Sequence, residues 1–242
     1  MALSLFDAFN GFFEMIPALT DDLKYEVYKL RYQVFCIETG FESPESHPGK
    51  IEFDEYDNHS LHYLVRHRKS GLFAATTRLI LPDAKNIERL FPIEKYTQFD
   101  NFELLKSIPR DIHLAEASRF CVSKEFKKRK NESGTLIGIN NDSIEDFSAD
   151  ERRTFPHISL ALIACLMKMF YENNINYCYA TMEPAWKRIL AAAGIYFIDI
   201  GPLTDYHGMR QPCVIKVSDV SSSVAKKNPA IWELITNKGR FG

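Results

Sequence analysis

Apolar residues along the chain recur first at helical spacing and later at strand spacing. A first helix is predicted between Thr20, whose hydroxyl can cap a helix, and Gly40, which favours a helix end. Asp21 and Asp22 fall in its first turn, where acidic side chains complement the helix dipole. Its apolar positions follow helical intervals: Leu23, Val27, Leu30, Val34 and Ile37.

Beyond this helix, strands and helices alternate. Residues 61–67 and 72–81 predict two strands joined by a polar turn, and the mixed stretch 83–110 predicts short helices. Further strands are predicted at 111–122, 176–182, 196–200 and 212–217, and helices at 156–171, 183–193 and from Asn228 to near Gly239. This order predicts an α/β protein with a mixed sheet.

We expect one domain over residues 1–242. Residues 1–19 form a short leader in this interpretation, residues 123–155 a long charged loop, and residues 219–242 a C-terminal tail helix. The composition, 45% hydrophobic and 26% charged, argues against extensive disorder.

Charge and hydropathy narrow the functional classes. A net charge of −2 argues against a nucleic-acid binder that depends on overall positive charge. The longest apolar stretch, 158–170, is interrupted by Lys168 and is shorter than the about 18–20 residues of a transmembrane helix. The first residues lack the basic region of a signal peptide, so we expect a cytoplasmic protein without a transmembrane segment.

The cysteines predict neither a disulfide framework nor a metal site. They are odd in number and widely spaced, without a CxxC motif or a zinc-type Cys/His spacing. We expect five buried, unbridged thiols: Cys36, Cys121, Cys165, Cys178 and Cys213.

The predicted strand 111–122 carries Glu116 and Arg119 among apolar residues. Charges in such a strand are costly unless they are paired or solvated. Either Glu116 and an arginine form a partly buried ion pair that holds the sheet, or Glu116 is an acid/base group in a cleft. Because alternate side chains face opposite ways, Glu116 and Arg119 can face one cleft only if a bulge lies between them. The hypothesis of a shared site therefore predicts an irregular ladder through 116–122.

Two more arginines stand at apolar positions. Arg31 lies on the apolar face of the first helix, and Arg78 lies near the end of the second predicted strand. An electrostatic site is one interpretation; the structural alternatives are a snorkelling Arg31 and a solvated acidic loop. That loop, residues 50–58, offers three carboxylates as partners: Glu52, Asp54 and Asp57.

These residues belong to an ordered set of motifs: RYQVF from Arg31, GF from Gly40, EFDEYD from Glu52, RLILP from Arg78 and EASRFCV from Glu116. The set resembles the autoinducer-synthase branch of the GNAT acyltransferase fold, which holds acyl-homoserine lactone synthases and long-chain N-acyl amino acid synthases. The resemblance spans roughly residues 20–217. More narrowly, the chain resembles the PEP-CTERM/exosortase-associated acyltransferase family, through HP from His47, SKEF from Ser123, PHISL from Pro156, MEP from Met182, GP from Gly201 and YHGMRQPC from Tyr206.

The resemblance implies a GNAT-like three-layer α/β fold with a central mixed, mostly antiparallel sheet. It implies transfer of a fatty acyl group from a phosphopantetheine thioester, on acyl carrier protein or CoA, to a primary amine such as that of an amino acid. We expect direct attack, with no covalent enzyme intermediate and no tightly bound cofactor. Glu116 carries over as the general base, and the acceptor side is lined by Arg31, Asp54, Asp57, Arg78 and Arg119.

Three further residue roles complete this interpretation. Backbone N–H groups at a strand irregularity around Cys121 and Val122 could stabilise the developing oxyanion. Phe35 and Phe41 could line an acyl tunnel, with core filling as the alternative. Cys121 is expected to be a small buried residue rather than a nucleophile.

The chain departs from the family patterns at two places. Ordinary GNAT enzymes bind the CoA pyrophosphate with a glycine-rich loop, and the segment before Pro156 lacks that pattern. Autoinducer synthases share this lack, because their donor is an acyl carrier protein. Phe41 stands where homoserine lactone synthases usually have Trp, so an amino acid or another amine is as strong a candidate acceptor as S-adenosylmethionine.

A basic run follows the strand that carries Glu116. It is either a solvated loop or a docking patch for the acidic acyl carrier protein. Nucleic acid is a poor partner, because Phe126 is the one aromatic residue available for base stacking there. The run comprises Lys124, Lys127, Lys128, Arg129 and Lys130.

The sequence therefore predicts a GNAT-like N-acyltransferase that uses a carrier-bound fatty acyl donor. Two alternatives stay open: an acyl-homoserine lactone synthase that uses S-adenosylmethionine, and a non-catalytic module that binds an acyl ligand or a carrier protein.

Overall fold

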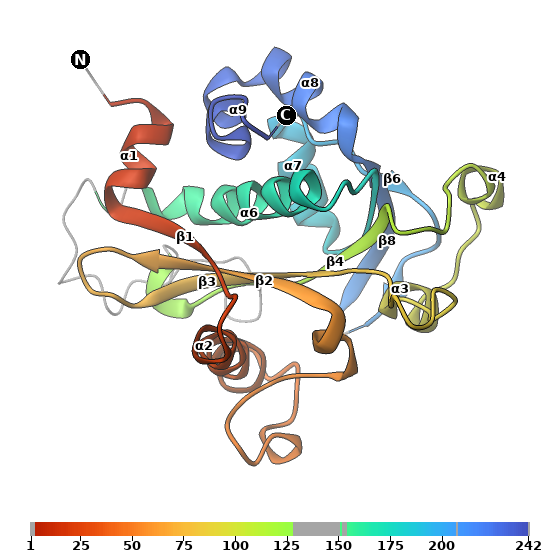
Figure 1. The fold of residues 1–242 in the computed structure, drawn as a ribbon, viewed down its shortest axis with the longest axis horizontal. Coiled ribbons are helices and arrows are strands. Elements are labelled where there is room, and N and C mark those ends of the chain that lie inside the picture. The colour runs from red at the N-terminus through yellow and green to blue at the C-terminus, as the bar shows by residue number, and fades with distance from the viewer. Residues whose placement is uncertain (1–2, 128–150, 152–153, 207, 242) are drawn as a thin grey trace. The chain divides into compact units, whose positions relative to one another are not determined.

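A computed structural model describes residues 3–127, 151, 154–206 and 208–241 (Figure 1). The strands are β1 Phe13–Pro17, β2 Ser60–His67, β3 Phe73–Ile80, β4 Leu114–Val122, β5 Tyr177–Met182, β6 Ile198–Asp199, β7 Thr204–Asp205 and β8 Met209–Lys216. The α-helices are α1 Leu5–Phe12, α2 Asp21–Tyr32, α3 Pro92–Tyr96, α4 Phe102–Lys106, α6 Ile158–Glu172, α7 Pro184–Ala193, α8 Val217–Lys227 and α9 Pro229–Thr236. A π-helix, η1 Gln33–Glu38, and four 3-10 helices, η2 Pro44–Ser46, η3 Glu55–His59, η4 Lys124–Phe126 and η6 Phe155–His157, complete the described helices.

The chain forms two compact units. The first unit comprises residues 1–57, 61–78 and 119–165, and the second unit comprises residues 58–60, 79–118 and 166–242. Strands β3 and β4 each contribute residues to both units.

Both units are built on a β-sheet. In the first unit the strand order is β1-β2-β3-β4, with β1 antiparallel to β2. In the second unit the order is β4-β5-β8-β6, and β7 also pairs with β8. Strands β4 and β5 are parallel, whereas β8 runs antiparallel to its three partners. The predicted α/β class with a mixed, mostly antiparallel sheet is confirmed.

Helix α2 begins as the sequence predicts. The Thr20 hydroxyl accepts a hydrogen bond from the Leu23 N–H at 3.3 Å, which satisfies one N–H of the first turn. After Tyr32 the helix widens into the π-helix η1, and Gly40 follows with a φ of 66°. The predicted helix is therefore present, with a wider last part.

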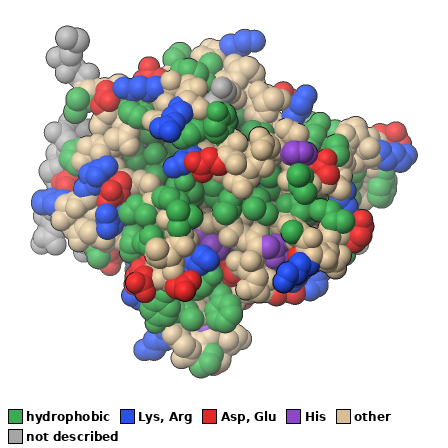
Figure 2. Space-filling model, viewed as in Figure 1, with side chains coloured by type: hydrophobic (Ala, Val, Ile, Leu, Met, Phe, Trp, Pro, Cys, Tyr) green, Lys and Arg blue, Asp and Glu red, His purple; other side chains and the backbone are tan. Residues whose placement is uncertain are grey.

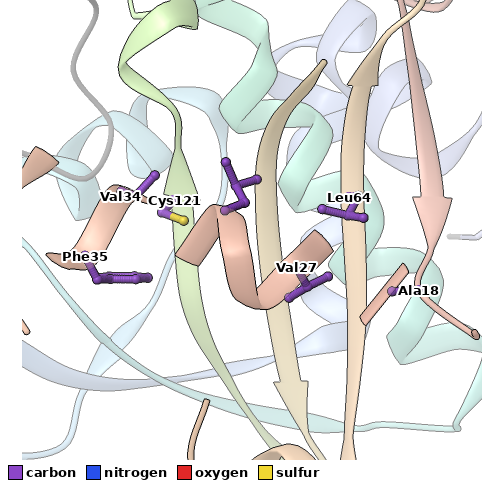
Figure 3. Packing of buried hydrophobic residues seen from close by; sticks show 7 residues of the cluster. Ala18, Val27, Val34, Phe35, Leu64 and Cys121 are labelled. Carbon is purple, nitrogen blue, oxygen red and sulfur yellow. The ribbon is translucent and has the colours of Figure 1, made fainter. Parts of the chain in front are cut away.

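Apolar residues of α2 and of the π-helix η1 pack on one face of the sheet in the first unit. Val27 and Val34 are fully buried and belong to one cluster with Leu64 of β2 and Cys121 of β4 (Figure 3). Figure 1 shows α2 on one side of β2 and β3 and the start of α6 on the other. This unit thus has the expected layers of helix, sheet and helix.

The ends of the chain differ from the predictions. The expected leader contains α1 and β1, because Phe9 and Phe13 are fully buried and β1 pairs with β2 from Phe13↔His67 to Pro17↔Tyr63. The expected tail helix is two helices, α8 and α9, because Pro229 cannot continue the first one.

Most of the predicted long loop lies outside the residues that the structure describes. Of residues 123–155, residues 128–150 and 152–153 lie outside the described residues. Among the helices that the structure describes, none combines the length and the hydrophobicity needed to cross a membrane.

Candidate active site

The first unit contains a buried network of ion pairs, here called the ionic cluster: Arg31, Glu52, Asp54, Asp57, Arg78 and Arg119. Its centre is Arg31, whose side chain has no exposed surface. The Arg31 Nε donates to Glu52 Oε2 at 2.5 Å, and its Nη1 donates to Asp57 Oδ1 at 2.7 Å. Arg31 is therefore not a snorkelling side chain but the inner partner of two carboxylates.

Two further arginines complete the cluster. Arg78 donates from Nη1 to Asp54 Oδ1 at 2.6 Å and to Asp57 Oδ1 at 2.9 Å. Arg119 donates from Nη2 to Glu52 Oε1 at 3.0 Å and to Asp54 Oδ2 at 3.3 Å. These contacts join α2, the segment 52–57 and the strands β3 and β4. The cluster brings together all five charged residues that the sequence assigned to the acceptor side.

Backbone N–H groups of the acidic segment, residues 52–57, hold its aspartate side chains in place. The Asp54 N–H donates to Asp57 Oδ2 at 2.7 Å, and the Tyr56 N–H donates to Asp54 Oδ1 at 2.9 Å. Aspartate side chains commonly make such bonds to nearby N–H groups in turns. The segment therefore presents its carboxylates to the arginines in a fixed arrangement.

Burial and the neighbouring arginines have opposite effects on the pKa values of the carboxyl groups in the cluster. Burial alone would raise the pKa of Glu52, but Arg31 and Arg119 outweigh it and hold that pKa at about 2. In the same way, Arg31 and Arg78 hold the pKa of Asp57 well below its ordinary value. Both carboxylates are therefore ionised at neutral pH.

His62 of β2 lies beside the cluster and was not predicted. Its ring nitrogens and Arg31 Nη2 are buried and have no hydrogen-bond partner among the described residues. Burial, with the added effect of Arg31, lowers the pKa of His62 to about 3, so the ring is neutral at physiological pH. A single histidine in an apolar strand gives no sequence signal of this environment.

Strand β4 is irregular at Arg119. This residue has a φ of 49°, a left-handed conformation that is uncommon for a residue other than glycine. The parallel register with β5 runs from Leu114↔Tyr177 to Ala117↔Ala180. Arg119 therefore interrupts the regular conformation of β4, while a bulge between Glu116 and Arg119 and a cleft that they share stay predictions.

Glu116 lies in the second unit, buried on β4. Its Oε2 accepts the N–H of Ile93, at the start of α3, at 2.9 Å. In register beside it on β5 is Tyr179, whose pKa is raised to about 12 by burial together with the charges of Glu94 and Glu116. The Phe91 ring packs against Tyr179 at 6.2 Å. Sequence analysis missed these neighbours, because contacts between distant segments leave no local pattern.

Cys121 and Val122, which follow Arg119 in β4, are buried. Burial raises the pKa of the Cys121 thiol to about 12, so it is not an activated nucleophile. Val122 is also buried, and an oxyanion role for the two backbone N–H groups stays a prediction. Phe35 belongs to the core cluster, and Phe41 packs against it, which is the core-filling alternative. Phe35 also lies under the Arg119 guanidinium at 5.4 Å from the ring centre.

The predicted docking patch needs correction at one position. Lys127 is only 5% exposed, and its charge acts on Glu38 and on Cys121, so it is not available to a partner. Lys124 is exposed. The other three members, Lys128, Arg129 and Lys130, lie outside the described residues.

The face of the protein drawn in Figure 2 has no large area of a single charge. Figure 2 shows acidic and basic side chains interspersed on the face in view. Within the described part of the chain, no group of His, Cys, Asp or Glu side chains is arranged to hold a metal ion. All five cysteines are buried and unbridged, as the sequence predicts.

Comparison with known proteins identifies the fold. Residues 30–136 match the family model described as the acetyltransferase (GNAT) domain. None of the curated proteins matches the sequence. The matched segment therefore resembles a GNAT domain, and the structure has a GNAT-like fold.

Three solved structures illustrate the likeness. The acyl-homoserine lactone synthase LasI is 17% identical, with a TM-score of 0.58 over 89% of this chain and 95% of its own. The CoA-dependent acyl-homoserine lactone synthase BjaI, solved with SAM and isopentyl-CoA, is 16% identical, with a TM-score of 0.56 over 91% of this chain and 89% of its own. FeeM, an N-acyl amino acid synthase from uncultured soil microbes, is 12% identical, with a TM-score of 0.53 over 89% of this chain and 96% of its own. At these identities the likeness concerns the fold.

Proposed function

We propose that this protein transfers a fatty acyl group from a phosphopantetheine thioester, on an acyl carrier protein or CoA, to the primary amine of an amino acid or a similar acceptor. The observation that carries the proposal is Glu116, a buried carboxylate on the strand that becomes irregular three residues later at Arg119. A buried acidic group with a backbone N–H partner is suited to proton transfer in a GNAT-type domain.

Glu116 acts as the general base in this proposal. An α-amine has a pKa of about 8 and must lose a proton before it attacks, whereas an unperturbed glutamate titrates near about 4.3. Glu116 is buried, and its Oε2 accepts a hydrogen bond from the Ile93 N–H, which holds the carboxylate in one orientation. A water molecule can relay the proton from the amine to Glu116.

The chemical step is a direct acyl transfer. The amine nitrogen attacks the thioester carbonyl carbon, and one proton of the amine passes to Glu116. The tetrahedral intermediate then collapses, the C–S bond breaks, and the departing pantetheine thiolate takes up the proton held by Glu116, which restores the carboxylate. Backbone N–H groups of Cys121 and Val122 are the proposed donors to the oxyanion.

The ionic cluster forms the acceptor side in this proposal. Ion pairs within the cluster keep Arg119 and Asp54 in fixed positions. Fixed side chains can hold the acceptor amine in place for attack, which lowers the entropic cost of the reaction. The narrower resemblance to the PEP-CTERM/exosortase-associated acyltransferases, and the carrier protein as the preferred donor, are parts of the same proposal.

The proposal is tested with the purified full chain and a donor-dependent thiol-release assay. Acyl carrier protein, CoA and pantetheine thioesters serve as donors, and the twenty amino acids, simple amines and S-adenosylmethionine serve as acceptors. Mass spectrometry identifies the N-acyl product. Glu116→Gln should lower turnover about 10²–10⁴-fold, the usual contribution of a general base.

Glu103→Gln is the matched control, because the Glu103 side chain is 88% exposed in the same unit. It should leave turnover unchanged. A product formed only from S-adenosylmethionine would establish the homoserine lactone synthase instead. Donor binding without turnover for any acceptor would establish a non-catalytic binding module.

A further inference from the structure

We propose that Glu94 of α3 is a positioning residue for acyl transfer: held by Arg110, it fixes the turn whose Ile93 N–H orients the carboxylate of Glu116. This role rests on the proposed function, in which Glu116 is the general base. Glu94 and Arg110 then act on the reaction through Glu116 rather than through contact with either substrate.

A hydrogen bond links the start of α3 to strand β4. The Ile93 N–H donates to Glu116 Oε2 at 2.9 Å, and the two residues are 1% and 3% exposed. Ile93 is the second residue of α3, so its N–H has no partner within the helix and is available to this carboxylate. A hydrogen bond weakens steeply when its donor turns away. Residues that fix the backbone at Ile93 therefore fix the orientation of Glu116.

Glu94 fixes that backbone by closing the turn around Ile93. Its Oε2 accepts the Phe91 N–H at 2.8 Å, and its own N–H donates to the Phe91 carbonyl at 3.0 Å. A glutamate that reaches back three residues to the N–H at a helix start is half of a capping box. The two hydrogen bonds join both ends of the segment 91–94, which contains Ile93.

Arg110 holds the side chain of Glu94 in this place. Its Nη1 forms an ion pair with Glu94 Oε1, and its Nη2 donates to the Arg89 carbonyl at 2.9 Å. Its guanidinium also lies 5.9 Å from the centre of the Phe91 ring. The side chains of Glu94 and Arg110 are 12% and 29% exposed, so the pair is partly shielded from water. These contacts leave the Glu94 carboxylate one position, over the Phe91 N–H.

The pair of Glu94 and Arg110 adds no net charge near Glu116. Burial raises the pKa of Tyr179, the residue in register with Glu116 on β5, to about 12, and Glu94 and Arg110 act on it in opposite directions. Orientation, rather than a change of local charge, is therefore the contribution of the pair. Loss of Glu94 should lower the rate of the step that uses Glu116 and leave the binding of donor and acceptor unchanged.

Two replacements of Glu94 separate its acceptor oxygen from its charge. Glu94→Ala removes both, whereas Glu94→Gln loses the charge and keeps a side-chain oxygen for the Phe91 N–H, as in capping boxes that use glutamine. Glu94→Ala should lower kcat about tenfold to a hundredfold without a change in KM, the scale of a displaced catalytic group. Glu94→Gln should recover most of that loss.

Asp83→Ala is the matched control for a broken ion pair. Asp83 pairs with Arg89 in the same unit, and their side chains are 19% and 28% exposed, close to the values for Glu94 and Arg110. This variant should leave kcat unchanged. A loss of kcat in Asp83→Ala as large as that in Glu94→Ala would overturn the positioning role.

Combination with Glu116→Gln shows whether Glu94 acts through Glu116. Once the base is absent its orientation no longer matters, so adding Glu94→Ala should not lower the residual rate further. A loss by the same factor with and without the base would assign Glu94 to the general stability of the fold and overturn the proposal.

Hydrogen exchange of the Ile93 amide, followed by NMR, tests the positioning without turnover. The amide should exchange slowly in the unaltered full chain and in Glu94→Gln, and at least about tenfold faster in Glu94→Ala. Equal exchange in all three proteins would overturn the role of Glu94. An unchanged kcat in Glu94→Ala, beside a loss of turnover in Glu116→Gln, would overturn it while upholding the proposed function. Absence of thiol release with every donor and acceptor would overturn the proposed function and, with it, any role of Glu94 in catalysis.

Discussion

Replacement of Arg31 by methionine would remove the central charge of the ionic cluster and keep most of the apolar side chain. Arg31 makes two buried hydrogen-bonded ion pairs, at 2.5 Å to Glu52 and at 2.7 Å to Asp57. Both carboxylates would stay buried, each with one of its arginine partners missing. Removing one member of a buried pair costs about 3–5 kcal/mol.

The pKa of Glu52 gives a second measure of this cost. Its decrease from 4.5 to about 2 corresponds to about 3 kcal/mol of folding free energy, at about 1.36 kcal/mol for each pH unit. Arg31 and Arg119 share this effect, so loss of Arg31 removes only part of it at Glu52. We therefore expect Arg31→Met to lower the free energy of unfolding at pH 7 by about 3 kcal/mol, the lower end of the cost of breaking a buried pair.

The pH dependence follows from the sign of the pKa change. A carboxyl group with a lowered pKa stabilises the fold fully above its unfolded pKa. This stability is lost as the pH falls from about 4.5 toward about 2, because the unfolded chain binds the proton first. In Arg31→Met the pKa of Glu52 lies closer to its ordinary value, so the loss of stability over this pH range is smaller.

Urea unfolding followed by circular dichroism measures both effects. Circular dichroism is preferable to tryptophan fluorescence, because Trp186 and Trp232 both belong to the second unit, whereas the ionic cluster lies in the first. Arg66→Met is the matched control: its partner Glu14 forms a partly exposed pair, worth less than about 1 kcal/mol. An Arg31→Met cost no larger than that of the control, or an unchanged acid dependence, would refute this reasoning.

Three further predictions concern stability and thiol reactivity. His62→Phe removes two buried nitrogens without hydrogen-bond partners among the described residues, so the free energy of unfolding in urea should not fall and should rise by up to about 1 kcal/mol; a loss above that size would contradict it. Gly201→Ala places a methyl group 1.8 Å from the Gln98 carbonyl oxygen and should cost at least about 2–3 kcal/mol by thermal unfolding, whereas Gly11→Ala, with no atom within 4 Å, should cost nothing. Because all five cysteines are buried, Ellman's reagent should label none of them in the native chain at pH 8 and five after unfolding; rapid native labelling of Cys121 would be inconsistent with its raised pKa.

Local patterns predicted the elements of the fold well. Thr20 caps α2 as its position before two aspartates indicates, and Pro229 begins the last helix. Strand β1 was missed, because five residues are too few to establish a period and its pairing partner β2 lies some fifty residues away. The π-helix after Tyr32 also leaves no pattern distinct from that of an α-helix.

The sequence predicted those parts of the site in which a charged residue interrupts an otherwise apolar element. Arg31, Arg78 and Arg119 each interrupt an apolar element, and the structure pairs them all with carboxylates of one acidic segment. Glu116 and Arg119 are three residues apart, so a regular strand would direct their side chains to opposite faces. The left-handed conformation of Arg119 interrupts this regular strand.

Other features of the site depend on tertiary contacts. The Ile93 N–H reaches Glu116 across 23 residues of sequence, and the burial of Lys127 in a basic run is invisible in its charge pattern. Such residues are found only when the chain is folded, because their partners come from separate elements.

The most direct test of the central claim follows the acyl group itself. The purified chain is incubated with an acyl carrier protein loaded with a ¹³C-labelled fatty acyl group and with the acceptor panel, and both small molecules and intact protein are analysed by mass spectrometry. Direct transfer predicts label in an N-acyl amide, one thiol released for each amide, no label on the protein, and near-complete loss of the amide with Glu116→Gln. Label bound covalently to the protein, labelled fatty acid without any amide, or full activity of Glu116→Gln would contradict the account.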